Sequence, residues 1–92
     1  MIRSFRDKDT GKVFRREFSR KFQSVAVVAK RKLDQIHAAA AISDLAAIPG
    51  NRFEALSSDR SGQYSIRVND HWRICSTWVE PHALDVEIVD YH

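Results

Sequence analysis

Cysteine, glycine and proline are all scarce in this sequence, which has one cysteine, three glycines and two prolines among 92 residues. The single cysteine, Cys75, excludes an internal disulfide and a cysteine-based zinc site, and the expected compartment is a reducing one, the cytoplasm. Three glycines leave no glycine-rich phosphate-binding loop. No apolar run approaches the ~20 residues that a membrane-spanning helix needs, so no membrane association is expected.

Lysine is absent after Lys32, and charge is unevenly divided along the chain. Residues 1–32 carry eleven Lys and Arg against three acids, whereas residues 33–92 carry four against nine. The basic first part suits a phosphate backbone, with a solvated helix surface as the alternative. Arginine binds phosphate in a bidentate manner, and the later cations are all arginines: Arg52, Arg60, Arg67 and Arg73.

Enough apolar side chains remain for one core. The apolar fraction is 43%, with two Trp and five Phe, so residues 1–92 are expected to form a single domain. The Arg-rich start has the composition of a transit peptide, but Asp7, Asp9 and Glu17 interrupt it. We therefore assign it to the fold.

Helical periodicity is confined to the first half of the chain. Phe14, Phe18 and Phe22 recur at helical spacing. They predict an amphipathic helix that begins with Asp9 or Thr10 as its cap and runs to Phe22, with cations on its other side.

A second helix is predicted from residue 24 to residue 42, with Ser24 as its cap. Ser43 is predicted to cap one further helical turn, which Pro49 and Gly50 end. The apolar face of the second helix is expected to consist of Val25, Ala29, Leu33, Ile36 and Ala40.

Strand patterns occupy the second half of the chain and also residues 2–5. Helices followed by an antiparallel meander predict an α+β domain. We expect a sheet of about five strands, with two N-terminal helices and a short helical turn packed on one face. The later strands are predicted at residues 52–57, 64–68, 72–79 and 83–91.

The hairpin between residues 64–68 and 72–79 has a predictable register. A two-residue turn would mix apolar and polar side chains, whereas a three-residue loop over residues 69–71 puts every apolar side chain on one face. The resulting pairs are Ile66 with Ile74, Val68 with Trp72, Ser65 with Cys75 and Arg67 with Arg73.

This register sets Arg67 directly opposite Arg73 on the face away from the core. Like charges in that position destabilise a strand pair, so we expect an anion to lie between them. The alternative is that the two arginines point into solvent or pair with Glu54, Asp85 or Glu87.

The last strand is expected to leave the core and to deliver Asp90, Tyr91 and His92 to an edge of the sheet. Asp90 and His92 keep the parity of the inward side chains, whereas Tyr91 points the other way. The loop at residues 57–62 is expected to bring Arg60 to the rim of the arginine face. The inward side chains of the strand are predicted to be Leu84, Val86 and Ile88.

These side chains suffice for cleavage of RNA without a metal, because the 2′-hydroxyl of RNA can attack the neighbouring phosphate. An enzyme then needs a base for that hydroxyl, an acid for the leaving 5′-oxygen and fixed cations for the developing charge. His92 suits either proton transfer, and Asp90 suits accepting a proton or orienting a reacting group. Tyr91 suits stacking on a base or positioning the backbone, and Arg73 and Arg67 suit holding the phosphate.

Other kinds of site fit less well. A serine hydrolase has no nucleophile elbow here. His71, His82 and His92 do not have the sequence spacing that is typical of metal ligands. Cys75 beside arginines would have a lowered pKa if it were reactive, with inert packing as the more common alternative for a strand cysteine.

The stretches "GQYSIRVND", "WRIC" and "VEIVDYH" resemble HigB-type toxins of the RelE/ParE superfamily, which belong to bacterial toxin–antitoxin modules. The resemblance is strongest over residues 49–92 and extends by helix order to the whole chain. It implies a compact sheet with helices on one face, and an mRNA endonuclease that acts in the ribosomal A site without a cofactor. It also implies a helix-turn-helix antitoxin of the HigA type as partner, with operator DNA bound only through that antitoxin.

The family's cleft residues match Arg73, Asp90, Tyr91 and His92, which the resemblance implies are catalytic. No metal is implied. The expected substrate contacts are Arg67, Arg60 and Glu54, and the expected ribosomal RNA contacts are Arg15, Arg16 and Lys21.

Two departures from the family pattern bear on the expected activity. Ser57 and Ser58 stand where relatives usually have Lys-Gly, and Glu54 stands where one branch has a histidine. These two departures leave open which residue is the general base. They also motivate an alternative, an attenuated or non-catalytic domain that binds the antitoxin and co-regulates its operon. A gyrase-directed toxin of the ParE branch fits poorly, because those relatives lack a terminal "DYH".

Overall fold

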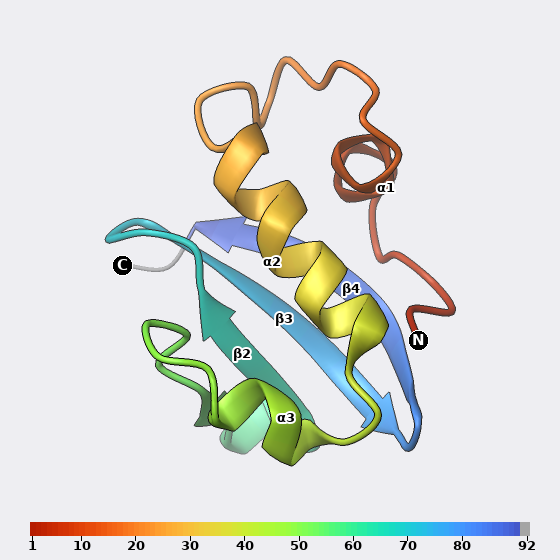
Figure 1. Ribbon diagram of the computed structural model, residues 1–92, viewed down its shortest axis with the longest axis vertical. Helices are drawn as coiled ribbons and strands as arrows, with labels where there is room; N and C mark the ends of the chain where they lie inside the picture. The colour runs from red at the N-terminus through yellow and green to blue at the C-terminus, as the bar shows by residue number, and fades with distance from the viewer. Residues whose placement is uncertain (91–92) are drawn as a thin grey trace.

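The computed structural model describes residues 1–90 and shows a four-stranded antiparallel sheet with helices on one face (Figure 1). The sheet order is β1 (Glu54–Ala55), β2 (Gln63–Arg67), β3 (Trp72–Val79) and β4 (His82–Asp90). A 3₁₀ turn, η1 (Ser58–Arg60), lies between β1 and β2. The predicted α+β class and antiparallel meander are confirmed.

The N-terminal segment adds a parallel element along the outer edge of β4. Ile2 is bridged to Ala83, and Phe5 is bridged to Val86. The Ile2 N–H also donates to Nδ1 of His37 at 3.1 Å. With this segment the sheet approaches the expected five strands, and the basic start is part of the fold.

The first helix, α1, is shorter than predicted and spans Lys8–Phe14. Asp7 caps it by accepting from the Thr10 N–H at 2.9 Å, so the predicted caps, Asp9 and Thr10, are wrong. The helix ends because Arg16 adopts a left-handed conformation with a φ of 61°.

The predicted phenylalanine stripe is therefore split between α1 and the loop that follows it. Phe22 is fully buried and packs edge-on against Trp72, with ring centroids 5.5 Å apart, whereas Phe18 is 71% exposed. The hydroxyl of Ser19 donates to Asp9 at 3.0 Å and folds the loop back onto α1. With this turn in the loop, Phe22 reaches Trp72.

The second helix, α2, spans Ala26–Ala38 and crosses the sheet over β3 and β4 (Figure 1). Val25 occupies its N-cap position without a side-chain hydrogen bond, so Ser24 is not the cap. Of the predicted apolar face, Ala40 is exposed because the helix ends two residues earlier. The other four residues of that face are buried, as predicted.

The short helix α3 spans Ile42–Ala46. Ser43 was the predicted cap, but the carboxylate of Asp44 completes the first turn by accepting from the N–H groups of Ala40 and Ala41, at 2.9 and 3.1 Å. The chain then turns at Gly50, whose φ of 87° favours glycine.

The β2–β3 hairpin has the predicted register. Asn69 fixes its three-residue loop by accepting from the N–H groups of His71 and Trp72, each at 2.9 Å. The confirmed pairs are Ile66 with Ile74, Ser65 with Cys75 and Arg67 with Arg73, and the Val68 N–H donates to the Trp72 carbonyl at 2.9 Å.

The pairing of β3 with β4 slips by one residue between Cys75 and Thr77. Asp85 takes up the extra residue in a left-handed conformation with a φ of 52°. Because of this bulge, Ala83 is fully buried and the predicted Leu84 is only half-buried. The rest of the predicted inward set of β4 lies in the core: Val86 and Ile88.

One cluster of apolar side chains fills the space between the sheet and the helices. Within residues 1–90, no helix is long and apolar enough to cross a membrane. The largest fully buried apolar side chains are Phe22, Leu33, Ile36, Leu45, Ile66, Ile74 and Val86.

Candidate active site

A row of four side chains crosses the outer face of the sheet, opposite to the helices. Glu54 on β1 pairs with Ser65 on β2, Ser65 with Cys75 on β3, and Cys75 with Glu87 on β4. Alternation along the strands puts this row on the face that α2 leaves uncovered. Ser65 and Cys75 are buried at its centre, and the two carboxylates stand at its ends.

Arg73 lies beside this row and is only 7% exposed. Its Nε donates to Ser65 Oγ at 2.9 Å, and its Nη2 donates to the Arg52 carbonyl at 2.5 Å. The same nitrogen lies 3.7 Å from Oε1 of Glu54. The guanidinium is therefore a fixed positive charge in the outer face.

Arg67 stands opposite Arg73 as predicted, but acceptors within the chain hold both side chains. Arg67 pairs with Asp70 in the hairpin loop, and this hydrogen bond lowers the pKa of Asp70. The predicted anion is thus not needed to keep the two arginines opposite each other. Of the acids considered as alternatives, Glu54 does lie beside Arg73, whereas the partner of Arg67 is Asp70.

The 3₁₀ turn η1 brings Arg60 to the outer face, as predicted. Its Nη1 donates to Gln63 and to Oε1 of Glu87, each at 3.0 Å. The Nε of Arg6 lies 3.5 Å from the second oxygen of Glu87. The hydrogen bond to Glu87 raises the pKa of Arg60. Glu87 therefore gathers two cations at the β4 end of the row.

The thiol of Cys75 lies near these arginines but is closed to solvent. Its residue is 1% exposed. Burial raises the pKa of Cys75, and this effect outweighs the lowering by Arg60 and Arg73. Burial and the raised pKa both favour the alternative of inert packing for this cysteine.

Asp90 ends β4 at the edge of the sheet. It pairs with Trp72 on β3, whereas Val89 pairs with Arg73, so Asp90 and Arg73 project to opposite faces. A cavity of about 520 Å³ opens at this edge. Besides Asp90, its lining includes Asp7, Lys21, Arg60, Trp72 and Glu87.

The cavity joins only some of the predicted site residues. Arg60, Asp90 and Lys21 line it, whereas Glu54 belongs to the outer-face row and Arg73 lies beside that row. Arg67 lies apart, at the hairpin loop. Tyr91 and His92, predicted beside Asp90, lie outside the described residues.

The predicted ribosomal RNA contacts lie on the connection from α1 to α2. Arg15 pairs with Glu17, Nε to Oε2, at 2.9 Å, and this bond lowers the pKa of Glu17. Lys21 lies 5.2 Å from the ring centroid of Phe22 and also lines the edge cavity. Arg16 is exposed at the end of α1.

Sequence reasoning did not include Asp7, Trp72 or Glu87 in the site. Trp72 had a signal, because the predicted register already placed it on the core face next to Arg73. Asp7 had a weaker one, its three-residue spacing to Thr10 at the start of a helix. The position of Glu87 opposite Cys75 follows only once the bulge at Asp85 is known.

Comparisons with known proteins point to one family. The family model described as "RelE-like toxin of type II toxin-antitoxin system HigB" matches residues 3–92 of the chain. "Toxin HigB-1" of Vibrio cholerae serotype O1 (strain ATCC 39315 / El Tor Inaba N16961) is 49% identical over 55 residues. That match covers 60% of this chain and 58% of the Vibrio protein, less than two thirds of either.

Proposed function

The chain belongs to the HigB-like family of RelE-like toxins of type II toxin–antitoxin systems, and we propose that it is a ribosome-dependent endoribonuclease that cleaves mRNA in the A site. The observation that carries this proposal is the edge cavity, in which the acid Asp90 shares a lining with the cations Lys21 and Arg60. An acid beside fixed cations is what phosphodiester cleavage requires.

The proposed chemistry needs no metal. The 2′-oxygen attacks the adjacent phosphorus, and the bond from phosphorus to the 5′-oxygen breaks. One group takes the proton of the 2′-hydroxyl, and another gives a proton to the 5′-oxygen. We assign these steps to the end of β4, with His92 as the acid, Asp90 as an accepting or orienting group and Tyr91 as a stacking side chain.

Three arginines are assigned to the phosphate charge in this proposal. Arg73 suits this role because Ser65 holds its guanidinium in place before any substrate arrives. Arg60 and Arg67 are the outer contacts, and the exposed carboxylate of Glu54 is assigned a contact to the substrate near Arg73.

The first test is mRNA cleavage on programmed ribosomes. Cuts in the A-site codon should vanish when His92 is deleted, and should fall at least about a hundredfold in Asp90→Asn, because a proton-transfer group contributes that much. Asp85→Asn, which removes the same charge from the same strand, is the matched control. Unchanged cleavage in both site variants would place the chemistry elsewhere.

The proposed partners are a helix-turn-helix antitoxin of the HigA type and the ribosome with its mRNA, with operator DNA reached through the antitoxin. Arg15, Arg16 and Lys21 are proposed to hold ribosomal RNA. Reversing the three to Glu should weaken ribosome binding and reduce its salt dependence, because fewer counterions are released. Lys8→Glu, which reverses one charge on α1, is the control. If it weakens ribosome binding as much per reversed charge as the triple variant does, the effect comes from net charge and not from contacts of these three residues.

A second candidate function is antitoxin binding without cleavage. It is favoured by the acceptors that already hold the three arginines: Glu87 for Arg60, Asp70 for Arg67 and the Arg52 carbonyl for Arg73. Cations that keep these partners would neutralise a scissile phosphate poorly. Intact protein that binds the antitoxin but cuts no mRNA at saturating concentration would support this candidate, and A-site cleavage would exclude it.

A further inference from the structure

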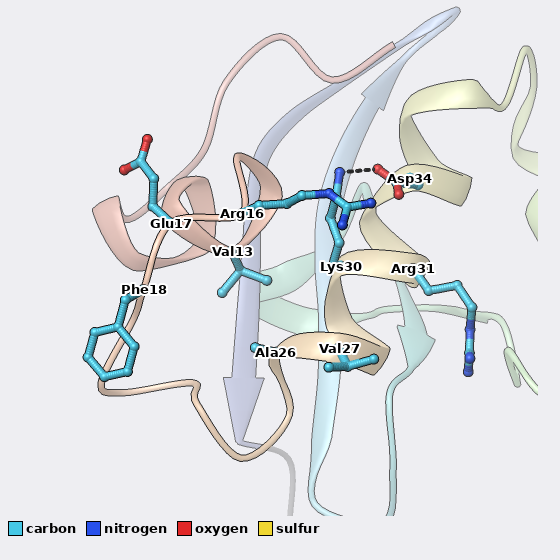
Figure 2. A pocket seen from close by; sticks show the side chains of 9 residues that line it. All are labelled: Val13, Arg16, Glu17, Phe18, Ala26, Val27, Lys30, Arg31 and Asp34. Carbon is cyan, nitrogen blue, oxygen red and sulfur yellow. Dashed lines mark hydrogen bonds and ion pairs between the residues drawn. The ribbon is translucent and has the colours of Figure 1, made fainter.

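A groove of about 600 Å³ lies on the helix side of the molecule, away from the outer-face row. Its walls are the end of α1, the loop that follows α1 and the first turns of α2 (Figure 2). Val13 and Ala26 face the groove from its two walls, and Arg16 extends across it toward Lys30. Of the predicted catalytic residues that the structure describes, neither Arg73 nor Asp90 lines it.

The groove has an unusual share of exposed apolar surface. Four large apolar residues are exposed among residues 1–90, namely Met1, Phe18, Val27 and Val79, and two of them line this groove. Val27 is 83% exposed and Phe18 is 71% exposed. Single exposed apolar side chains need no explanation, but neighbours around one groove mark an interaction surface.

The charges around the groove leave a positive surplus. Lys30 is paired with Asp34, Nζ to Oδ1, at 2.6 Å, and Glu17 is paired with Arg15. Arg16 and Arg31 line the same groove, and residues 1–90 contain no ion-pair partner for either guanidinium. The groove is thus apolar between two unpaired cations.

We propose that this groove docks a segment of the antitoxin in which apolar side chains are flanked by Asp or Glu. The apolar side chains would cover Val27 and Phe18, and the carboxylates would meet Arg16 and Arg31. This inference rests on the proposed function only in taking the antitoxin as the partner.

Two other occupants fit the groove less well. A phosphate backbone, the contact proposed above for Arg16 on the ribosome, would use the arginines but leave the apolar part of the groove unexplained. It would gain little from Val13, Ala26 and Val27, because contacts to nucleic acid backbones are polar and charged. A second copy of this chain would bring the same positive groove against itself in a two-fold dimer, which places like charges together.

The test is the affinity of the chain for the antitoxin encoded beside it, measured by calorimetry. Val27→Asp should weaken binding at least about tenfold, because a central apolar anchor is lost and a like charge meets the partner's acids. Arg31→Glu should act in the same direction. Residue 27 lies in the first turn of α2, where an acid is favourable, so the variant should fold.

Matched controls come from elsewhere on the surface. Val79→Asp puts the same change on another exposed valine, and Lys8→Glu reverses another exposed cation. Both should stay within about twofold of the unmodified chain, as surface changes outside an interface do. Amide chemical shifts of residues 16–31 should also move when the antitoxin is added.

Each of the following outcomes would overturn the docking proposal and leave the proposed function unaffected. Unchanged antitoxin affinity in Val27→Asp and Arg31→Glu would exclude the groove. Weaker ribosome binding with unchanged antitoxin affinity would make it an RNA surface, and loss of self-association in sedimentation would make it a dimer interface. The proposed function fails on a different result, the absence of A-site cleavage by the unmodified chain.

Discussion

The hydroxyl of Thr10 accepts a hydrogen bond from the backbone N–H of Ile88 at 3.0 Å, two residues before Asp90. Thr10 is fully buried, and its hydroxyl donates in turn to Asp7 at 2.7 Å. The N-terminal segment pairs with the backbone of β4 only as far as Val86. Beyond that point the side chain of Thr10 takes over as the hydrogen-bond partner of the β4 edge. This relay fixes the strand that presents Asp90.

Replacing Thr10 by valine tests this relay, because the shape is kept and the hydroxyl is lost. The Ile88 N–H is then buried without a partner, and the free energy of unfolding should fall by about 1–3 kcal/mol. Urea denaturation measures the loss, and hydrogen exchange of the Ile88 amide should become faster.

Thr10→Ser is the control, since it keeps the hydroxyl and removes one methyl group. It should cost about 0.8 kcal/mol and leave the Ile88 amide protected. If Thr10→Val is as stable as the unmodified chain, the relay does not hold the edge of β4.

Arg73→Lys is expected to destabilise the protein as well as to reduce cleavage. One ammonium group does not reach both Ser65 Oγ and the Arg52 carbonyl, so a buried acceptor loses its donor, at a cost of about 1–3 kcal/mol. Thermal or urea unfolding gives the first effect, and ribosome-programmed cleavage gives the second. Arg67→Lys, whose partner Asp70 is exposed, should leave stability nearly unchanged.

A cleavage defect in Arg73→Lys without a stability defect would contradict this expectation. It would mean that the bonds to Ser65 and Arg52 contribute nothing to folding. The guanidinium would then act on the substrate alone.

The register that sets Arg67 opposite Arg73 could be predicted from the sequence because burial decides it. Only one loop length sorts Ile66 and Ile74 onto one face, and a slip of one residue would put Ile66 opposite Arg73 and place the two isoleucines on different faces. The delivery of Asp90 to a sheet edge followed from the same alternation. The alternation of apolar and polar side chains, together with one buried face, was therefore enough to predict most of the sheet.

The errors have a common physical cause, which is contact between distant parts of the chain. Phe18 and Phe22 have helical spacing, yet the loop turns so that Phe22 can cover Trp72. The bulge at Asp85 has no local signal, because its N–H pairs with Ser4 Oγ at 2.9 Å, across 81 residues. Local patterns do not contain such partners.

Lys32 predicts a dependence of stability on pH. It is 8% exposed, and its Nζ donates to the neutral amide of Asn51 at 2.5 Å. Burial lowers the pKa of Lys32 from its ordinary value of 10.5, with further lowering by Arg31 and Arg67. The charged lysine is therefore less favourable in the folded chain than in the unfolded chain.

The penalty is full below the folded pKa and disappears as the pH rises to the ordinary value, because the unfolded chain then loses its proton too. Lys32→Gln removes this term while its amide can still donate to Asn51. The difference in unfolding free energy between the two proteins should therefore shift in favour of Lys32 as the pH rises toward 10.5. Urea unfolding across this range measures it, and a constant difference would contradict it.

Glu87 is predicted to restrain anion binding on the outer face, because its two oxygens hold Arg60 at 3.0 Å and Arg6 at 3.5 Å. Glu87→Gln keeps the shape and frees both guanidinium groups. Affinity for a single-stranded RNA oligonucleotide should rise, and the slope of log affinity against log salt should steepen by about 1, as one more phosphate is neutralised. Fluorescence anisotropy at several salt concentrations measures both.

Asp85→Asn is the matched control for that experiment, because it removes the same charge two residues away on the same strand. Asparagine also tolerates the left-handed conformation of residue 85. A larger effect of Glu87→Gln than of Asp85→Asn would assign Arg6 and Arg60 to phosphate binding. Equal effects would reduce the change to the net charge of the protein, and neither arginine would then be a contact.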